Sequence, residues 1–168
     1  GTATAPAPAV ATVGDFNDPN RINNLVTGEQ WEGAFVKLTN VTVTEVIFFS
    51  GNRVSFNVID ANGNKLNVSD RYLAQKLPSY QTVNPNSPQT TGSFAPPVPG
   101  TFYNSLSGVV RHDANGCTGD AGRGYELNPF LSTHYDIGFA PPYISMVERD
   151  PKIPTSSQTV DVEFNIAD

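Results

Sequence analysis

The alternation of apolar and polar residues predicts that most of this chain is β-strand. The longest run covers residues 32 to 50 and reads EGAFVKLTNVTVTEVIFFS, with apolar residues at every second position and a change of parity near Asn40. Successive side chains of a strand point to opposite faces, so a change of parity inside one strand indicates a bulge or a sharp coil. Such a strand can serve two sides of a barrel.

Two further β-rich runs, residues 53–60 and 65–69, flank the dipeptide Asn62-Gly63. Asn-Gly between two such runs is the strongest short-range signal for a β-hairpin, because both residues tolerate the positive φ of the tight turn. With the first strand, these runs predict a meander of three antiparallel strands.

The next part of the chain predicts a helix and two more strands. Residues 70–77 suit a short helix, and residues 106–112 and 125–128 are again β-rich. Three strands, a helical insertion and two strands is the order of an OB-type barrel. We therefore predict an all-β fold in which residues 15–139 form a small OB-like β-barrel, closed or partly open.

A long Pro-rich arm, residues 78–103, interrupts this barrel. No charged residue occurs between Pro78 and Val110. Connections longer than about 15 residues without regular structure are uncommon in compact domains and are often functional. Aromatic residues at intervals predict that the arm packs onto the barrel, and they are candidate binding residues: Tyr80, Phe94, Phe102 and Tyr103.

Both ends of the chain differ from the barrel. Residues 1–14 are an uncharged Ala/Thr/Pro stretch that predicts an extended linker. The prolines at Ala140-Pro141-Pro142 indicate a second linker at the start of residues 140–168. Within this tail, apolar residues alternate with polar ones from Val160 to Ile166, and Pro151 and Pro154 predict a bend between two strands.

Composition narrows the class of protein. The 168 residues carry a net charge of −6, and the ten Lys and Arg residues are scattered singly along the sequence, which disfavours nucleic acid as a partner. No apolar run reaches the roughly 20 residues that span a membrane. A single cysteine, Cys117, in a Thr/Asn/Gly/Pro-rich β protein is typical of exported bacterial surface proteins. We expect an extracellular or cell-surface location, with any signal peptide already removed.

No residue pattern indicates catalysis, so the chain is not expected to be an enzyme. His112-Asp113 and His134-Tyr135-Asp136 are the His/Asp neighbours, and no Gly-x-Ser-x-Gly turn accompanies them. Cys117 has no local signature of a nucleophile. No cofactor is implied.

Two loops resemble oxygen-ligand cation sites. Asp60-Ala-Asn-Gly-Asn64 begins like an EF-hand loop, but Lys65 and Arg71 stand where a glycine and an acid are required. The loop from Asp113 to Asp120 offers further oxygen ligands. The EF-hand match of the first loop therefore fails, we interpret the second as a solvated loop, and we predict no metal.

A binding platform is the remaining candidate site. OB barrels bind oligonucleotides or sugars on strands two and three and on the flanking loops. Phe56 and Tyr72, with Arg53 and Arg71 nearby, could form such a platform. For Phe56 the alternative is a place in the core. The acidic net charge and the arm over this face both argue against a ligand here.

The strings WEGAFVKLTNVTVT, FNVIDANGNKLNVSDR, LSGVVRH and GYELNPF, between Gln30 and Gly138, resemble the OB-like barrel modules of large secreted bacterial surface proteins. The tail PPYISMVERDPKIPTSSQTVDVEFNIAD is similar to the opening strands of an immunoglobulin-like module. Such a domain has about seven strands, whereas the tail supplies two. Either the chain is a fragment, or its last strand, within residues 158–166, pairs with another molecule.

Three functional hypotheses follow. The first is a noncatalytic structural or protein-binding module of an exported bacterial cell-surface protein, whose partners are other domains of a longer polypeptide or another surface protein. The second is an OB-fold module that binds an oligosaccharide or nucleic acid beside a secreted enzyme. The third is a fibre or envelope-assembly subunit that adds its terminal strand to a neighbour.

Overall fold

The computed structural model describes the residues in six segments. They are 6–49, 53–73, 95–112, 124–139, 143–150 and 161–167, and in the last two segments the backbone alone is described. The chain divides into two compact units, Gly1–Gly138 and Phe139–Asp168. Each unit is treated by itself.

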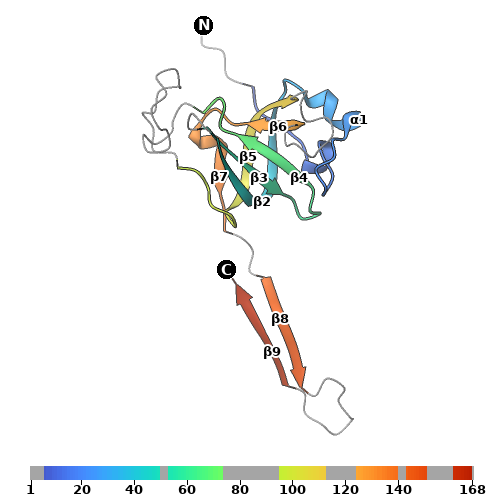
Figure 1. The fold of residues 1–168 in the computed structure, drawn as a ribbon, viewed down its shortest axis with the longest axis vertical. Coiled ribbons are helices and arrows are strands. Elements are labelled where there is room, and N and C mark those ends of the chain that lie inside the picture. Colours follow the sequence, from blue (N-terminus) through green and yellow to red (C-terminus); the bar gives the residue numbers. More distant parts are fainter. Residues whose placement is uncertain are drawn as a thin grey trace. The chain divides into compact units, whose positions relative to one another are not determined.

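The first unit is a closed β-barrel of five strands (Figure 1). The strands are β2 (Phe35–Phe49), β3 (Arg53–Ile59), β4 (Lys65–Ser69), β5 (Phe102–His112) and β6 (Tyr125–Asn128). They are hydrogen-bonded in the order β2-β3-β4-β6-β5, and pairing of β5 with β2 closes the ring. The contact between β4 and β6 is parallel and the others are antiparallel. The predicted OB-like β-barrel is confirmed.

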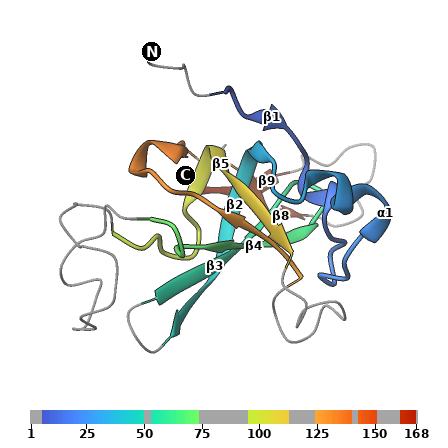
Figure 2. The ribbon, with the colours of Figure 1, turned by 90° about the horizontal axis from the view of Figure 1, so that it is seen from above.

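Short elements surround the barrel. Two strands extend its sheet, β1 (Ala9–Val10) beside β2 and β7 (Tyr135–Ile137) beside β5. In the part of the chain that the structure describes, the short helices are η1 (Val13–Asp15), α1 (Leu25–Gly28), η2 (Glu29–Trp31) and η5 (Ser132–His134). In both views α1 lies at one side of the barrel (Figure 1, Figure 2). Within the described residues, no helix has the length and apolar character needed to cross a membrane.

Strand β2 coils at Asn40, as its apolar pattern predicts. The last buried side chain before Asn40 is that of Leu38, and the first buried side chain after it is that of Val41. These two residues are three positions apart, so the buried side chains change from even to odd positions. Asn40 has φ 53°, in the left-handed region. The neighbouring strand changes parity at the same place, because Leu106 pairs with Leu38 and Tyr103 pairs with Val41. The two strands therefore turn together, and both halves of β2 face the core.

We expect Asn40→Val to lower the free energy of unfolding by about 1–2 kcal/mol, because a β-branched side chain is disfavoured at positive φ. Thr39→Val is the matched control, since residue 39 is an exposed strand neighbour outside the coil. Chemical denaturation of both variants measures the difference. Equal stability of the two variants would show that the coil does not depend on the left-handed residue.

The prediction of a linker over residues 1–14 is wrong from residue 9 onward. β1 pairs in parallel with β2, and the N–H of Ala11 donates to the carbonyl of Lys37 at 3.1 Å. Ala11 and Val13 are buried in the core together with Phe16. An uncharged Ala/Val stretch can continue a sheet as easily as it can form a linker, and here β2 supplies the partner.

The predicted arm is also shorter than residues 78–103. Residues 95–98 are irregular and a turn follows at 99–100, but Phe102 already begins β5. The first residues of β5 find backbone partners because the coiled half of β2 extends to meet them, with Thr42 opposite Phe102. Residues 78–94 lie outside the described residues, as do residues 74–77 of the predicted helix. Residues 71–72 form a turn.

The second unit contains a two-stranded antiparallel sheet. β8 (Tyr143–Asp150) pairs with β9 (Asp161–Ala167), and the register shifts between Ser145 and Glu148. Two strands were predicted in this tail and two are present. The immunoglobulin-like assignment stays a prediction, and so does strand addition through residues 158–166.

Candidate functional site

The outer face of β3, β4 and β6 is buried although it is polar. Its side chains point away from the barrel core, yet none of the following is more than 4% exposed: Ser55, Asn57, Asn67, Ser69, Glu126 and Asn128. Buried polar groups are costly unless they are paired. β3 and β4 are the second and third barrel strands, whose outer face is the ligand surface of OB barrels. This face is therefore the candidate functional site.

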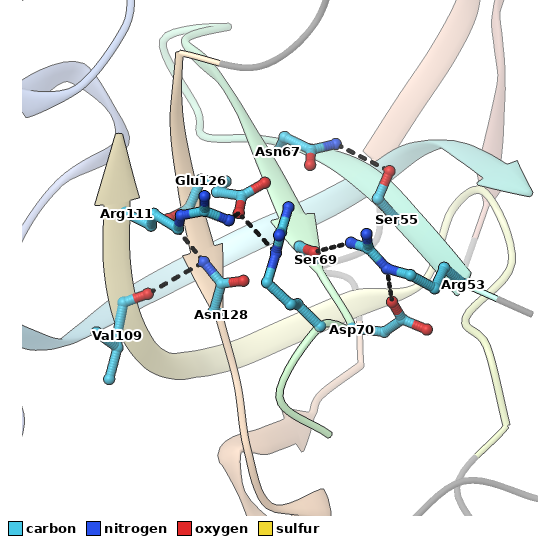
Figure 3. Close-up of polar contacts among 10 residues, drawn as sticks. Arg53, Ser55, Asn67, Ser69, Asp70, Val109, Arg111, Glu126 and Asn128 are labelled. Atoms are coloured by element: carbon cyan, nitrogen blue, oxygen red, sulfur yellow. Dashed lines mark hydrogen bonds and ion pairs between the residues drawn. The ribbon is translucent and has the colours of Figure 1, made fainter. Parts of the chain in front are cut away.

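One row of polar residues crosses five strands of this face. The pairing register places Glu45 of β2, Asn57 of β3, Asn67 of β4, Glu126 of β6 and Arg111 of β5 side by side. Asn57 Nδ2 donates to Glu45 Oε2 at 2.9 Å, and Asn67 Nδ2 lies 3.0 Å from Asn57 Oδ1. Arg111 Nη1 lies 3.7 Å from Glu126 Oε1 (Figure 3). We call these five residues the polar row.

Glu126 is the most enclosed charge in the polar row. Its side chain is 3% exposed, and Arg71 Nε lies 3.5 Å from the same Oε1 that Arg111 approaches. Burial lowers the pKa of Arg21, and the negative charges of Glu45 and Glu126 oppose that shift. The guanidinium of Arg21 therefore interacts electrostatically with both carboxylates of the polar row, although Arg21 precedes the first barrel strand.

A second ion pair lies beside the polar row, where β3 begins. Arg53 Nε is 3.8 Å from Asp70 Oδ1, and Arg53 Nη2 donates to Ser69 Oγ at 3.2 Å (Figure 3). The carboxylate of Asp70 also accepts from the backbone N–H of Val54 at 2.8 Å. Asp70 thus ties the end of β4 to the start of β3.

The tertiary structure gathers arginines that are scattered in the sequence. All four arginines whose side chains the structure describes lie at this face, where they meet three carboxylates: Arg21, Arg53, Arg71 and Arg111 with Glu45, Asp70 and Glu126. The chain as a whole carries a net charge of −6. Among these seven charged groups the arginines therefore outnumber the carboxylates, in contrast to the chain as a whole.

Three predicted binding residues come together at this end of the barrel. Arg53 and Arg71 enter the ion pairs described above, and Tyr72, 48% exposed, follows in the turn after β4. Tyr80 and Phe94 lie outside the described residues.

The remaining two aromatics lie in β5, and the predicted binding role is wrong for Tyr103, whose side chain is buried. Tyr103 is a core residue, 1% exposed, with its ring 6.2 Å from Phe56 and 6.0 Å from Tyr135. Burial raises the pKa of the Tyr103 hydroxyl. Phe102 is part of β5 and is half-buried. Phe56 lies in the core, which was the alternative interpretation. Inward-facing positions of a barrel strand are filled by large side chains, whatever their binding potential.

Two exposed aromatics are not among the predicted binding residues. Phe48 and Phe49 end β2, 71% and 41% exposed, and Phe49 pairs with Arg53. Two adjacent aromatics in a strand cannot both face the core, because neighbours point to opposite faces. This alternation is the feature of the sequence that predicts exposure of at least one of the two rings. In OB barrels the loop after the first barrel strand contacts ligand.

The two histidines occupy different surroundings. His134 contacts Phe35 and Phe130, with ring centroids 5.3 and 4.2 Å away, and burial lowers the pKa of His134. His112 stacks on Tyr125 with a centroid distance of 4.4 Å. The predicted solvated loop at residues 113–120 lies outside the described residues. In the other loop, Asp60 accepts hydrogen bonds from the backbone N–H groups of residues 62 and 64, which gives its carboxylate a turn-forming role.

Similarity to known proteins adds no functional residue to this site. No family model, curated protein or solved structure matches the chain. Function is therefore argued from the chain's own geometry, which defines an OB-like barrel with a buried polar face.

Proposed function

We propose that the chain is a noncatalytic structural or protein-binding module of an exported bacterial cell-surface protein. The observation that carries this proposal is the closed state of the face on which OB barrels bind ligands. Glu126 is 3% exposed and held by Arg71 and Arg111. A low charge content and a single cysteine support the exported setting.

Ligand access to this face would be costly. The amides of Asn57 and Asn67 are bonded within the polar row, and Asn128 Nδ2 lies 3.4 Å from the carbonyl of Val109. A ligand would have to displace arginine side chains and separate buried charges before it gained its own hydrogen bonds. Separation of a buried charge from its partner typically costs several kcal/mol. A buried face whose amides and charged groups contact one another serves barrel stability better than it serves reversible binding.

A second candidate function rests on the rim of the face. Phe48, Phe49 and Tyr72 are exposed and lie at the end of the barrel where β3 begins with Arg53. Exposed aromatic rings beside a cationic group can stack on the flat faces of sugars or bases. This arrangement favours the ligand-binding alternative, with an oligosaccharide as ligand, because the net charge of −6 disfavours nucleic acid.

Thermal unfolding with added ligands distinguishes the two functions. We expect no change in Tm when the chain is mixed with soluble glucan or chitin oligosaccharides, or with a single-stranded oligothymidylate. A true ligand at 100 times its Kd stabilises a protein by about 2.7 kcal/mol, which raises Tm by several degrees. A saturable rise in Tm that Phe48→Ala and Tyr72→Ala abolish, and that the exposed control Val98→Ala retains, would replace the first proposal with the second.

A further inference from the structure

Three potential metal ligands converge at the opposite end of β5 from the coil. The carboxylate oxygens of Glu29 and Glu32 and an imidazole nitrogen of His112 all lie within 4.8 Å of one another. We propose that these three side chains form a binding site for a divalent transition-metal ion of the Zn²⁺ class. This proposal is independent of the proposed function.

The fold brings these residues together through backbone pairing. Glu29 and Glu32 lie on one 3-10 turn, in which the N–H of Glu32 donates to the carbonyl of Glu29 at 3.2 Å. The chain then runs beside β5, where the N–H of Gly33 donates to the carbonyl of Val110 at 2.9 Å. This pairing carries Glu32 to the end of β5, which terminates at His112. Both carboxylates therefore sit beside the imidazole.

Tyr125 orients two of the three ligands. It pairs with His112 across β5 and β6, and the two rings stack at 4.4 Å with an interplanar angle of 20°. The hydroxyl of Tyr125 lies 3.0 Å from Glu29 Oε2 and donates a hydrogen bond to it. Metal-binding carboxylates and histidines are commonly held by such outer partners. Tyr125 is fully buried, so this support is rigid.

A glycine permits the close approach of the 3-10 turn. A Cβ on Gly28 would lie 2.5 Å from the Tyr125 ring, so a larger residue would push Glu29 away from the hydroxyl. Gly28 thus leaves the space that the Tyr125 ring needs in order to reach and orient Glu29.

The ligand set selects the kind of ion. One imidazole nitrogen and two carboxylate oxygens are ligands that Zn²⁺ accepts, at about 2.0–2.2 Å. Ca²⁺ and Mg²⁺ prefer oxygen alone. Two carboxylates also balance the charge of a divalent ion. Tetrahedral binding requires ligand atoms about 3.4 Å apart, which rotation of the exposed Glu32 side chain toward Glu29 and His112 can provide. Three protein ligands leave a fourth position for water.

Equilibrium dialysis and calorimetry with ZnCl₂ test the site at neutral pH. The full chain carries Cys117→Ser in every sample, which removes its single thiol. We expect one Zn²⁺ per chain. Glu32→Gln and His112→Gln should weaken binding by more than tenfold, whereas Asp136→Asn and His134→Gln should leave it unchanged. The last two make the same chemical changes at an exposed carboxylate and at the second histidine of the chain.

A further variant tests the orienting role of Tyr125. Tyr125→Phe keeps the buried ring and removes the hydroxyl, so we expect folded protein with Zn²⁺ affinity lowered by about 10- to 100-fold. Circular dichroism confirms folding, and the His112 ring signals in NMR should shift with Zn²⁺. If His112→Gln does not fold, the Zn²⁺ affinity of Glu32→Gln, a change at an exposed side chain, decides whether the site exists. Absence of stoichiometric Zn²⁺, or equal binding by Glu32→Gln and Asp136→Asn, would overturn the proposal.

Discussion

Glu126→Gln is expected to lower the free energy of unfolding by about 3 kcal/mol, because it leaves two arginines facing a neutral, enclosed side chain. Glu126 is 3% exposed, and its Oε1 lies 3.5 Å from Arg71 and 3.7 Å from Arg111. Loss of one partner from a buried ion pair typically costs about 3–5 kcal/mol. Both distances exceed a short charge-assisted hydrogen bond, and both arginines are partly exposed. The lower end of this range therefore applies.

Urea denaturation of Glu126→Gln and Glu45→Gln measures this effect against a matched control. Glu45 lies in the same polar row and accepts from Asn57 at 2.9 Å, but its side chain is exposed. Exposed charge interactions contribute about 1 kcal/mol or less. The same chemical change should therefore have a small effect at residue 45. Equal losses at the two positions would show that burial does not set the importance of Glu126.

Gly108→Ala is expected to destabilise the barrel by about 3 kcal/mol, at the upper end of the range for overpacking. A Cβ on Gly108 would lie 2.7 Å from the carbonyl carbon of Asn128 and 2.7 Å from the nitrogen of Pro129. Both atoms belong to the backbone at the end of β6, so no side-chain rotation can relieve the contact. Relief would require β5 and β6 to separate, and their pairing is part of barrel closure.

Ser105→Ala is the control for this substitution. Residue 105 lies in the same strand and already has a Cβ, so the change to alanine adds no atom. We expect a loss below about 1 kcal/mol, typical of substitutions outside the core. Thermal and chemical denaturation of both variants provide the comparison. If Gly108→Ala were as stable as Ser105→Ala, the contact between β5 and the end of β6 would be looser than the structure shows.

The barrel strands could be predicted because their signals are local. The parity change at Asn40 marks the coil of β2, and Asn62-Gly63 marks the turn between β3 and β4. Each signal depends on residues within one strand or one turn. The errors at residues 1–14 and 102–103 have the opposite origin. There the strand state depends on a backbone partner in β2, which is distant in sequence.

The candidate site was predicted in part. Arg53, Arg71 and Tyr72 were expected near one another because they flank β3 and β4, which are joined by a hairpin. Glu126 and Arg111 could not be added to them from the sequence. Their place beside Asn67 depends on the parallel pairing of β4 with β6, whose residues are far apart along the chain.

The sequence by itself determined an all-β chain and the strand order of an OB-like barrel, because the two-residue period and the turn residues act locally. The tertiary structure alone decided what the polar residues do. Barrel closure sets the register among five strands, and this register aligns the polar row and gathers arginines that are scattered along the chain. The same closure brings Glu29, Glu32 and His112 together at the end of β5. The surroundings of each charged or metal-binding side chain depend on its neighbours in adjacent strands, and no local sequence pattern specifies those neighbours.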